Sequence, residues 1–143
     1  MAAESSATTV WEGDLANGSG VTTPASGAFP ATDVSWASRT ERAVGKTSPE
    51  ELLAAAHAAC FCMGLAHELA EAGTPPDRLE ATATVAFVPG EGVTSSHIVV
   101  SGTVPGIDAD TFAAAAAAAG EGCPISGALK GNVEITVDAT LEG

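Results

Sequence analysis

The stretch SPEELLAAAHAACFCMGLAHELAEAGTPP, residues 48–76, decides the fold of this chain. Ser48 is a good helix N-cap, a proline follows in the first turn, and Glu51 stands where a capping box needs an acid. Leu52 to Ala72 then continues as a helix until Gly73 and two prolines end it. The helix is apolar nearly all round, which is typical of a helix buried in the middle of a structure.

Strand-like segments precede this helix. Thr8 to Asp14 and Gly20 to Thr23 are expected to form a hairpin around Ala16-Asn17-Gly18-Ser19, because Asn-Gly readily takes positive φ. A third strand is expected from Thr32 to Thr40, with Arg39 near its end.

The remainder of the chain mixes strands and helices. Asp108 is expected to cap a helix built largely on Ala113 to Ala119, and Cys123-Pro124 to open a short helix reaching about Lys130. Strands are expected at Leu79–Val88, His97–Val104 and Val133–Leu141. The order predicts one α+β domain over residues 1–143 with an antiparallel sheet, and the short chain suggests that a second copy helps to cover the central helix.

Composition excludes some functions. The chain has 143 residues, 45% of them hydrophobic, and 18 acids against 5 bases give a net charge of −13. Such a surface repels phosphate backbones, so we expect no nucleic-acid partner. The N-terminus lacks a signal-peptide pattern, and the apolar stretch Leu52–Leu65 covers only about four turns, too short to cross a bilayer. We therefore expect a cytoplasmic protein with no membrane partner.

The three cysteines read as reactive, metal-binding or merely buried thiols. Cys60 lies in the middle of the apolar helix, where burial raises a thiol pKa, so Cys60 needs a nearby cation to act as a nucleophile; otherwise it is a small core residue. Cys123 lies at an expected helix start, where backbone N–H groups stabilise a thiolate. Local chemistry leaves open which of the two attacks and which resolves.

Cys62 and the histidines offer alternatives. Cys62 is about 200° around the helix from Cys60, which favours a core role and makes it a poor disulfide partner. His57 and Cys60 share a helix face, but His67 lies about 15 Å along the axis from His57, so these groups cannot converge on one ion. We expect no metal site.

Four segments together resemble the OsmC/Ohr family of thiol-dependent peroxidases, and the OsmC branch most of all. They are WEGD at 11–14, SPEELLAAAHAACF at 48–61, VPGID at 104–108 and GCPISGALK at 122–130. The resemblance implies an intertwined homodimer in which antiparallel sheets wrap a pair of central helices.

The resemblance also implies the chemistry. Cys60 matches the peroxidatic cysteine and Cys123 the resolving one, while Arg39 matches the arginine that holds the thiolate and Glu50 the acid that orients it. A Cys60 sulfenic acid would condense with Cys123 to a disulfide. An external dithiol of lipoyl type would reduce that disulfide, so no cofactor is expected.

The expected substrates are organic hydroperoxides, with hydrogen peroxide besides, because Phe61 and Met63 or partner-chain residues would supply apolar walls. Arg42 competes in sequence for the role of Arg39. Cys62 and the loop from Gly27 to Val34, which carries Phe29, depart from the family pattern. The alternative functions are a non-enzymatic protein that binds a small apolar ligand, and a redox sensor.

Overall fold

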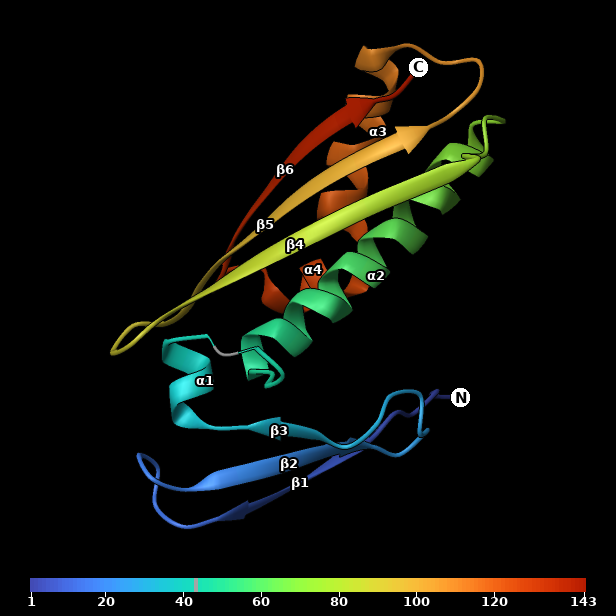
Figure 1. Cartoon of the computed structure of the whole chain (residues 1–143). Helices are drawn as coiled ribbons and strands as arrows, with labels where there is room; N and C mark the ends of the chain where they lie inside the picture. Colours follow the sequence, from blue (N-terminus) through green and yellow to red (C-terminus); the bar gives the residue numbers. More distant parts are fainter. Residues whose placement is uncertain (43) are drawn as a thin grey trace. The chain divides into compact units, whose positions relative to one another are not determined.

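The computed structural model describes residues 1–42 and 44–143. Contacts divide the chain into two compact units, Met1–Leu52 and Leu53–Gly143 (Figure 1). The boundary falls within the first turn of helix α2, which runs from Pro49 to Glu71 as the capping pattern predicted.

The first unit is built on a three-stranded antiparallel sheet in the order β1-β2-β3. Its strands are β1 (Ala7–Glu12), β2 (Ser19–Pro24) and β3 (Thr32–Val34). The predicted hairpin is present, but the positive φ in its connection lies at Gly13 (φ 92°), and Asp14 accepts hydrogen bonds from the backbone of Asn17 (2.7 Å) and Gly18 (2.9 Å). The aspartate side chain therefore shapes this turn.

The third strand was predicted to reach Thr40, and this was wrong. It ends at Val34, and helix α1 (Trp36–Thr40) follows. Ser35 and Ser38 form a capping box, in which each side chain accepts the backbone N–H of the other. These reciprocal bonds satisfy the donors of the first turn, and they outweigh the alternating apolar pattern that suggested a strand.

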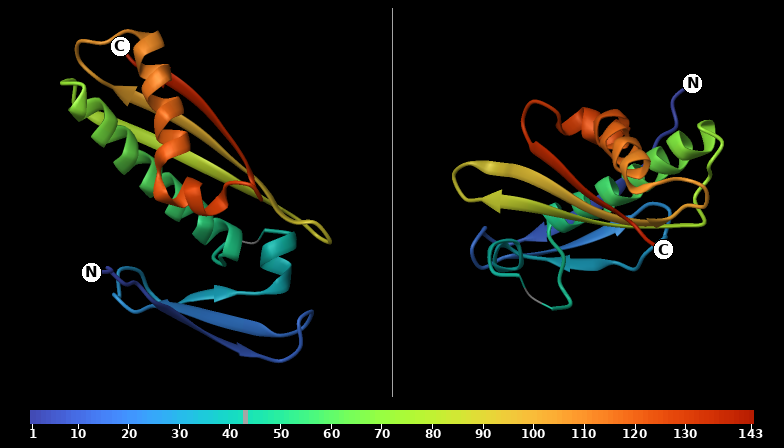
Figure 2. Two further views of the ribbon diagram at one scale, coloured as in Figure 1. Left: turned by 180° about the vertical axis from the view of Figure 1, so that it is seen from behind. Right: turned by 90° about the horizontal axis from the view of Figure 1, so that it is seen from above.

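The second unit contains the sheet β4-β5-β6 and most of the helical residues. Its elements are β4 (Arg78–Val88), β5 (Gly92–Thr103), α3 (Ala109–Gly122), α4 (Pro124–Leu129) and β6 (Glu134–Leu141). Helices α2 and α3 lie on the same face of this sheet (Figure 2). The α+β class is confirmed.

One strand pair departs from the antiparallel sheet that we predicted. Strands β4 and β5 pair antiparallel, but β5 and β6 pair parallel, with His97 opposite Thr136. The connection from β5 to β6 passes through α3 and α4, and parallel neighbours require a crossover of this length.

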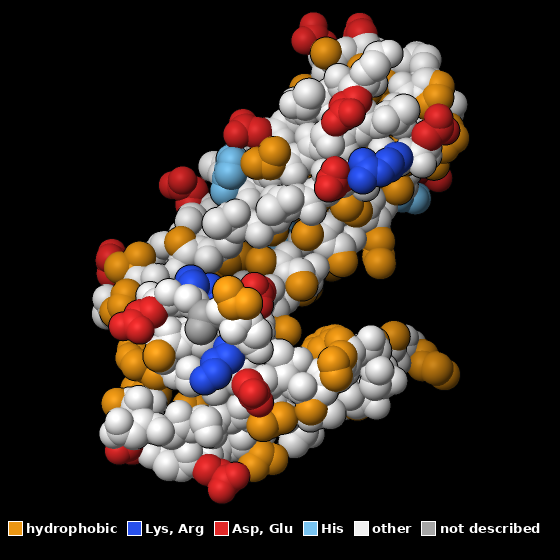
Figure 3. All heavy atoms as spheres, in the orientation of Figure 1, with side chains coloured by type: hydrophobic (Ala, Val, Ile, Leu, Met, Phe, Trp, Pro, Cys, Tyr) orange, Lys and Arg blue, Asp and Glu red, His pale blue; other side chains and the backbone are white. Residues whose placement is uncertain are grey.

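The hydrophobic core lies in the second unit. Phe61, Leu65 and Leu69 of α2 are buried together with side chains from β5 and α3, among them Ile98, Val100, Phe112 and Ala116. Among the described residues, every fully buried hydrophobic side chain belongs to this unit. The sheet of the first unit exposes Val10, Trp11 and Val21, and Figure 3 shows many hydrophobic side chains at the surface.

Helix α2 has 23 residues, more than the stretch Leu52–Leu65 that we judged too short for a bilayer. By length and composition alone it could cross a membrane, and it is the one described helix that could. This is weak evidence, because the core helix of a soluble protein has the same length and composition.

The close approach of β5 to Phe112 leads to a stability prediction. A Cβ at Gly102 would lie 2.7 Å from the Phe112 ring, so Gly102→Ala should destabilise the fold by about 1–3 kcal/mol through overpacking. Urea unfolding measures this effect. Gly127→Ala, which meets nothing within 4 Å, is the matched control. Equal unfolding midpoints for the two variants would contradict this packing.

Candidate active site

Arg39 and Glu50 form a forked ion pair in the first unit. The Arg39 Nε donates to both carboxylate oxygens of Glu50 (3.0 and 3.2 Å), and Nη2 donates to Oε2 at 2.8 Å. The Glu50 side chain is 7% exposed and that of Arg39 is 30% exposed. The guanidinium also stands 6.0 Å from the centre of the Trp36 ring. Two parallel contacts fix the plane of the guanidinium. The ammonium group of a lysine could not make such a forked contact.

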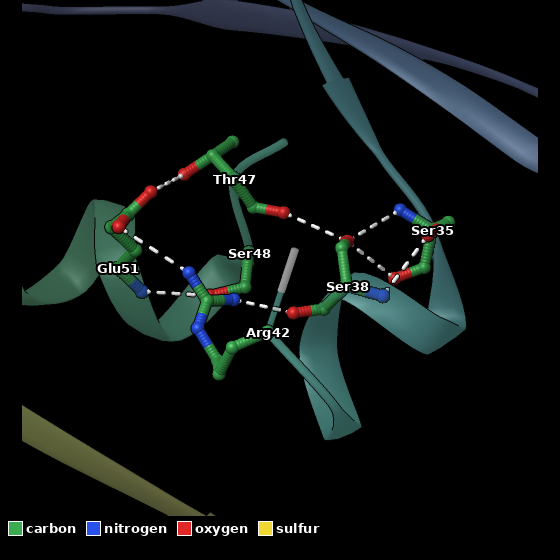
Figure 4. A network of polar contacts seen from close by, with 6 residues as sticks. All are labelled: Ser35, Ser38, Arg42, Thr47, Ser48 and Glu51. Carbon is green, nitrogen blue, oxygen red and sulfur yellow. Dashed lines mark hydrogen bonds and ion pairs between the residues drawn. The ribbon is translucent and has the colours of Figure 1, made fainter. Parts of the chain in front are cut away.

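A network of polar contacts joins α1 to the start of α2 (Figure 4). Ser38 donates its hydroxyl to the Thr47 carbonyl at 2.9 Å, and Arg42 binds the Ser38 carbonyl and Glu51. The backbone of Glu51 donates to Ser48 Oγ at 3.0 Å, as the capping pattern predicted, while its carboxylate accepts from Thr47 and Arg42. Arg42 is thus engaged in holding the two helices, whereas Arg39 faces Glu50.

A pocket of about 330 Å³ borders Arg39 within the first unit. Its walls are largely apolar and include Trp11, Leu15, Val34 and Trp36. A cation at the edge of an apolar pocket suits a ligand with an oxygen-rich end and a hydrocarbon body.

Cys60 lies half-buried in α2, and its thiol interacts with the side chain of Cys123 and the backbone N–H of Ile125. Burial raises the pKa of the Cys60 thiol most, the Ile125 N–H lowers it, and the nearby Cys123 raises it further. Among the described residues no Lys or Arg contributes to these effects. The surroundings of Cys60 in its own unit therefore oppose a thiolate, as expected from its position in the helix.

Cys123 is 2% exposed and forms the N-cap of α4, as its sequence position predicted. Its Sγ accepts the backbone N–H of Ser126 at 3.4 Å and lies 3.1 Å from the Ser126 hydroxyl. The structure thus brings together the two thiols that the sequence singled out, Cys60 from α2 and Cys123 from the start of α4.

The other predicted residues lie elsewhere. Cys62 is turned toward strand β4, where the backbone of Ala81 contacts its thiol, and burial raises its pKa. Phe61 is fully buried in the core, whereas Met63 is 73% exposed. The role of Phe61 and Met63 in binding substrate stays a prediction, as do the catalytic roles of Cys60, Cys123, Arg39 and Glu50.

Two features escaped the sequence analysis. His57 was considered only as a metal ligand, yet its ring nitrogens bind the hydroxyls of Ser96 (2.6 Å) and Ser126 (2.8 Å). These serines are 39 and 69 residues away, so no local spacing could reveal them. The pocket residues Leu15 and Trp36 also carried no motif that would mark them.

Two interacting thiols in an α+β scaffold are an arrangement that suits thiol-based redox chemistry. The family model described as OsmC-like protein matches residues 41–138. The peroxiredoxin OsmC of Escherichia coli (strain K12) is 41% identical over 135 residues, 92% of each chain. The chain belongs to the OsmC family, as the resemblance implied, and the expectation of a peroxiredoxin-type enzyme is confirmed at that level.

Solved structures agree with this fold. The organic hydroperoxide resistance protein OhrB of Bacillus subtilis matches with a TM-score of 0.65 and 26% identity, over 94% of this chain and 98% of that chain. An OsmC like protein from Mycoplasma pneumoniae matches over 100% of both chains with a TM-score of 0.70, and its 18% identity supports the fold alone.

The buried histidine makes stability depend on pH. Burial lowers the pKa of His57 from its ordinary 6.5, so the unfolded chain binds more protons than the folded one as the pH falls through 6.5. The stabilisation that a neutral His57 gives the folded chain is therefore complete above pH 6.5, and it is lost as the pH falls below this value. We expect the urea midpoint to fall more steeply between about pH 7.5 and pH 5 in wild type than in His57→Gln. His67→Gln, on the exposed side of α2, should behave as wild type; equal slopes for all three proteins would contradict this assignment.

Proposed function

We propose that this protein is a thiol-dependent peroxidase that reduces organic hydroperoxides, and hydrogen peroxide besides, with Cys60 as the attacking and Cys123 as the resolving thiol. The observation that carries the proposal is the interaction of these two side chains within the second unit. A thiol that is oxidised and then trapped as a disulfide needs a second thiol close enough to interact with it.

The reaction divides into two oxidative steps. The Cys60 thiolate attacks the distal peroxide oxygen, so that an S–O bond forms and the O–O bond breaks. The leaving alkoxide, or hydroxide when the substrate is hydrogen peroxide, takes a proton from solvent. Cys60 is then a sulfenic acid. Cys123 attacks that sulfur, an S–S bond forms, and the oxygen leaves as water.

Arg39 is the proposed activator of Cys60. The groups around Cys60 in its own unit raise the thiol pKa, so a cation must counter them. The bases of that unit, Arg78 and Lys130, lie at the start of β4 and the end of α4. Arg39, held by buried Glu50, presents an oriented guanidinium, and its assignment to Cys60 rests on the family likeness and on this need.

The apolar pocket beside Arg39 supports organic hydroperoxides as substrates. Several solved relatives are named as organic hydroperoxide resistance proteins, which points the same way. Met63, exposed on α2, is the proposed contact from the second unit, with Phe61 supporting it from the core. An external dithiol of lipoyl type would reduce the Cys60–Cys123 disulfide, with no resident cofactor.

The proposed functional form is a cytoplasmic homodimer in which residues 1–143 act as one domain. No hydrophobic side chain among the described residues of the first unit is fully buried, and Val10, Trp11 and Val21 are exposed, so its sheet needs an apolar partner. A second copy supplies one in the intertwined arrangement that the family likeness implies. Lone three-stranded sheets without a covered face are only marginally stable.

The central test is peroxide consumption with cumene hydroperoxide or hydrogen peroxide and dihydrolipoamide. Wild type should turn over, and Cys60→Ser should lose activity by at least about 10³-fold, because a hydroxyl is a poor nucleophile toward peroxide. Cys62→Ser, two residues further along α2, is the matched control and should keep activity. Absence of turnover by wild type with every peroxide would refute the enzyme assignment and favour a ligand-binding role.

Mass spectrometry after one equivalent of peroxide should show a Cys60–Cys123 disulfide, and a Cys60–Cys62 disulfide would refute the resolving role of Cys123.

The dimer has its own test. Size exclusion with light scattering should give twice the mass of the 14.0 kDa chain. Val10→Glu with Val21→Glu, in paired positions of β1 and β2, should weaken that dimer by placing charge on its proposed apolar interface. A monomer at all concentrations in wild type would contradict the proposal.

A further inference from the structure

A line of buried polar groups in the second unit ends at Cys123. His57 is fully buried, with Nδ1 at 2.6 Å from Ser96 Oγ and Nε2 at 2.8 Å from Ser126 Oγ. The Ser126 hydroxyl lies 3.1 Å from Cys123 Sγ. Neither step of the proposed function uses His57, Ser96 or Ser126.

Each described buried polar group of this line has a hydrogen-bond partner. Burying a histidine and two serines costs free energy unless all are hydrogen-bonded, and an apolar core would avoid that cost. The line joins α2, β5 and α4, and its one open end is a thiol that must lose a proton.

Resting on the proposed function, we propose that Ser126 and His57 form a proton relay that takes the proton of Cys123 when this thiol attacks the Cys60 sulfenic acid. Ser126 touches the reacting sulfur and is the catalytic residue of the relay. His57 acts only through Ser126 and is a positioning residue.

The relay requires one tautomer of His57. A neutral imidazole carries one N–H, so Nε2 accepts from Ser126 in the proposed relay, and Nδ1 carries the hydrogen and donates to Ser96. Ser126 then accepts from the Cys123 thiol. Burial lowers the pKa of His57, which favours the neutral ring and leaves the Nε2 lone pair free for the serine proton.

The step balances as follows. The Cys123 proton passes to Ser126 while the serine proton passes to His57 Nε2. The Cys123 sulfur bonds to the Cys60 sulfur, and the S–O bond of the sulfenic acid breaks. The leaving hydroxide takes a proton from solvent, and the imidazolium returns its proton to solvent through Ser126. Thiol and sulfenic acid have become a disulfide and one water.

The surroundings of the relay permit this exchange. The groups that face His57 are the hydroxyls of β5 and α4, and burial alone accounts for its pKa shift. Charged neighbours lie at the surface: Glu121 of α3 and Lys130 after α4 line a pocket of about 370 Å³. Ser126, which is 2% exposed, lines the same pocket, and the proposed relay exchanges its proton with water there.

The test separates the two oxidative steps in single turnovers with one equivalent of cumene hydroperoxide. Dimedone trapping follows the Cys60 sulfenic acid, and mass spectrometry of quenched samples follows the Cys60–Cys123 disulfide. We expect His57→Gln and Ser126→Ala to form the disulfide about a hundredfold more slowly at pH 7, and Ser126→Thr to recover most of the rate. Gln can still bind Ser126 but cannot take a proton, so it keeps the contact and removes the relay.

The pH profile distinguishes a relay from a purely structural role. Without the relay, hydroxide from solution must take the Cys123 proton, so the deficit should shrink steadily as the pH rises. His67→Gln, on the same helix but exposed, is the matched control and should follow wild type. An equal deficit at every pH, or no deficit, would overturn the relay. Failure of wild type to form either a dimedone adduct or the disulfide would instead refute the proposed function.

Discussion

Burial of the Cys60 thiol is the constraint on which the rest of this protein depends. One face of the helix that carries Cys60 packs into the core of its own unit, and the partial burial of Cys60 raises the thiol pKa. A thiol in that state is inert toward peroxides. A cation that lowers the pKa of Cys60 must therefore be brought to the helix. The chain has only 5 Lys and Arg residues, so few groups can serve.

Helix α2 carries candidate residues of both units. Its first turn carries Glu50, which holds Arg39 in a fork, and its middle carries His57 and Cys60, one turn apart. Its apolar residues Phe61 and Leu65 anchor it in the core. Cys123 lies at the start of α4. The Ser126 hydroxyl lies within hydrogen-bond distance of both the Cys123 sulfur and His57 Nε2. In the proposals above, Arg39 of α1 activates the first thiol, and His57 of α2 assists the deprotonation of the second.

The sequence carried enough information for the long helix, the capped helix α3 and the short helix after Cys123, because caps and breakers act locally. The prediction was wrong where two local signals disagree. At Ser35 and Ser38 the alternating pattern favours a strand, but the capping box of these serines stabilises a helix. It failed also where topology decides, as for the parallel β5–β6 pair. The hydroxyl partners of His57 stand far away in sequence, so only the folded chain reveals them.

The central claim is that Cys60 depends on Arg39 for its reactivity, since its own unit opposes a thiolate. The most direct measurement is the pH dependence of the alkylation rate of Cys60 by iodoacetamide, in wild type and Arg39→Gln, on a Cys62→Ser, Cys123→Ser background. The account predicts a pKa below the ordinary value of about 8.5 in the first protein and above it in the second. The same pKa in both proteins would contradict it.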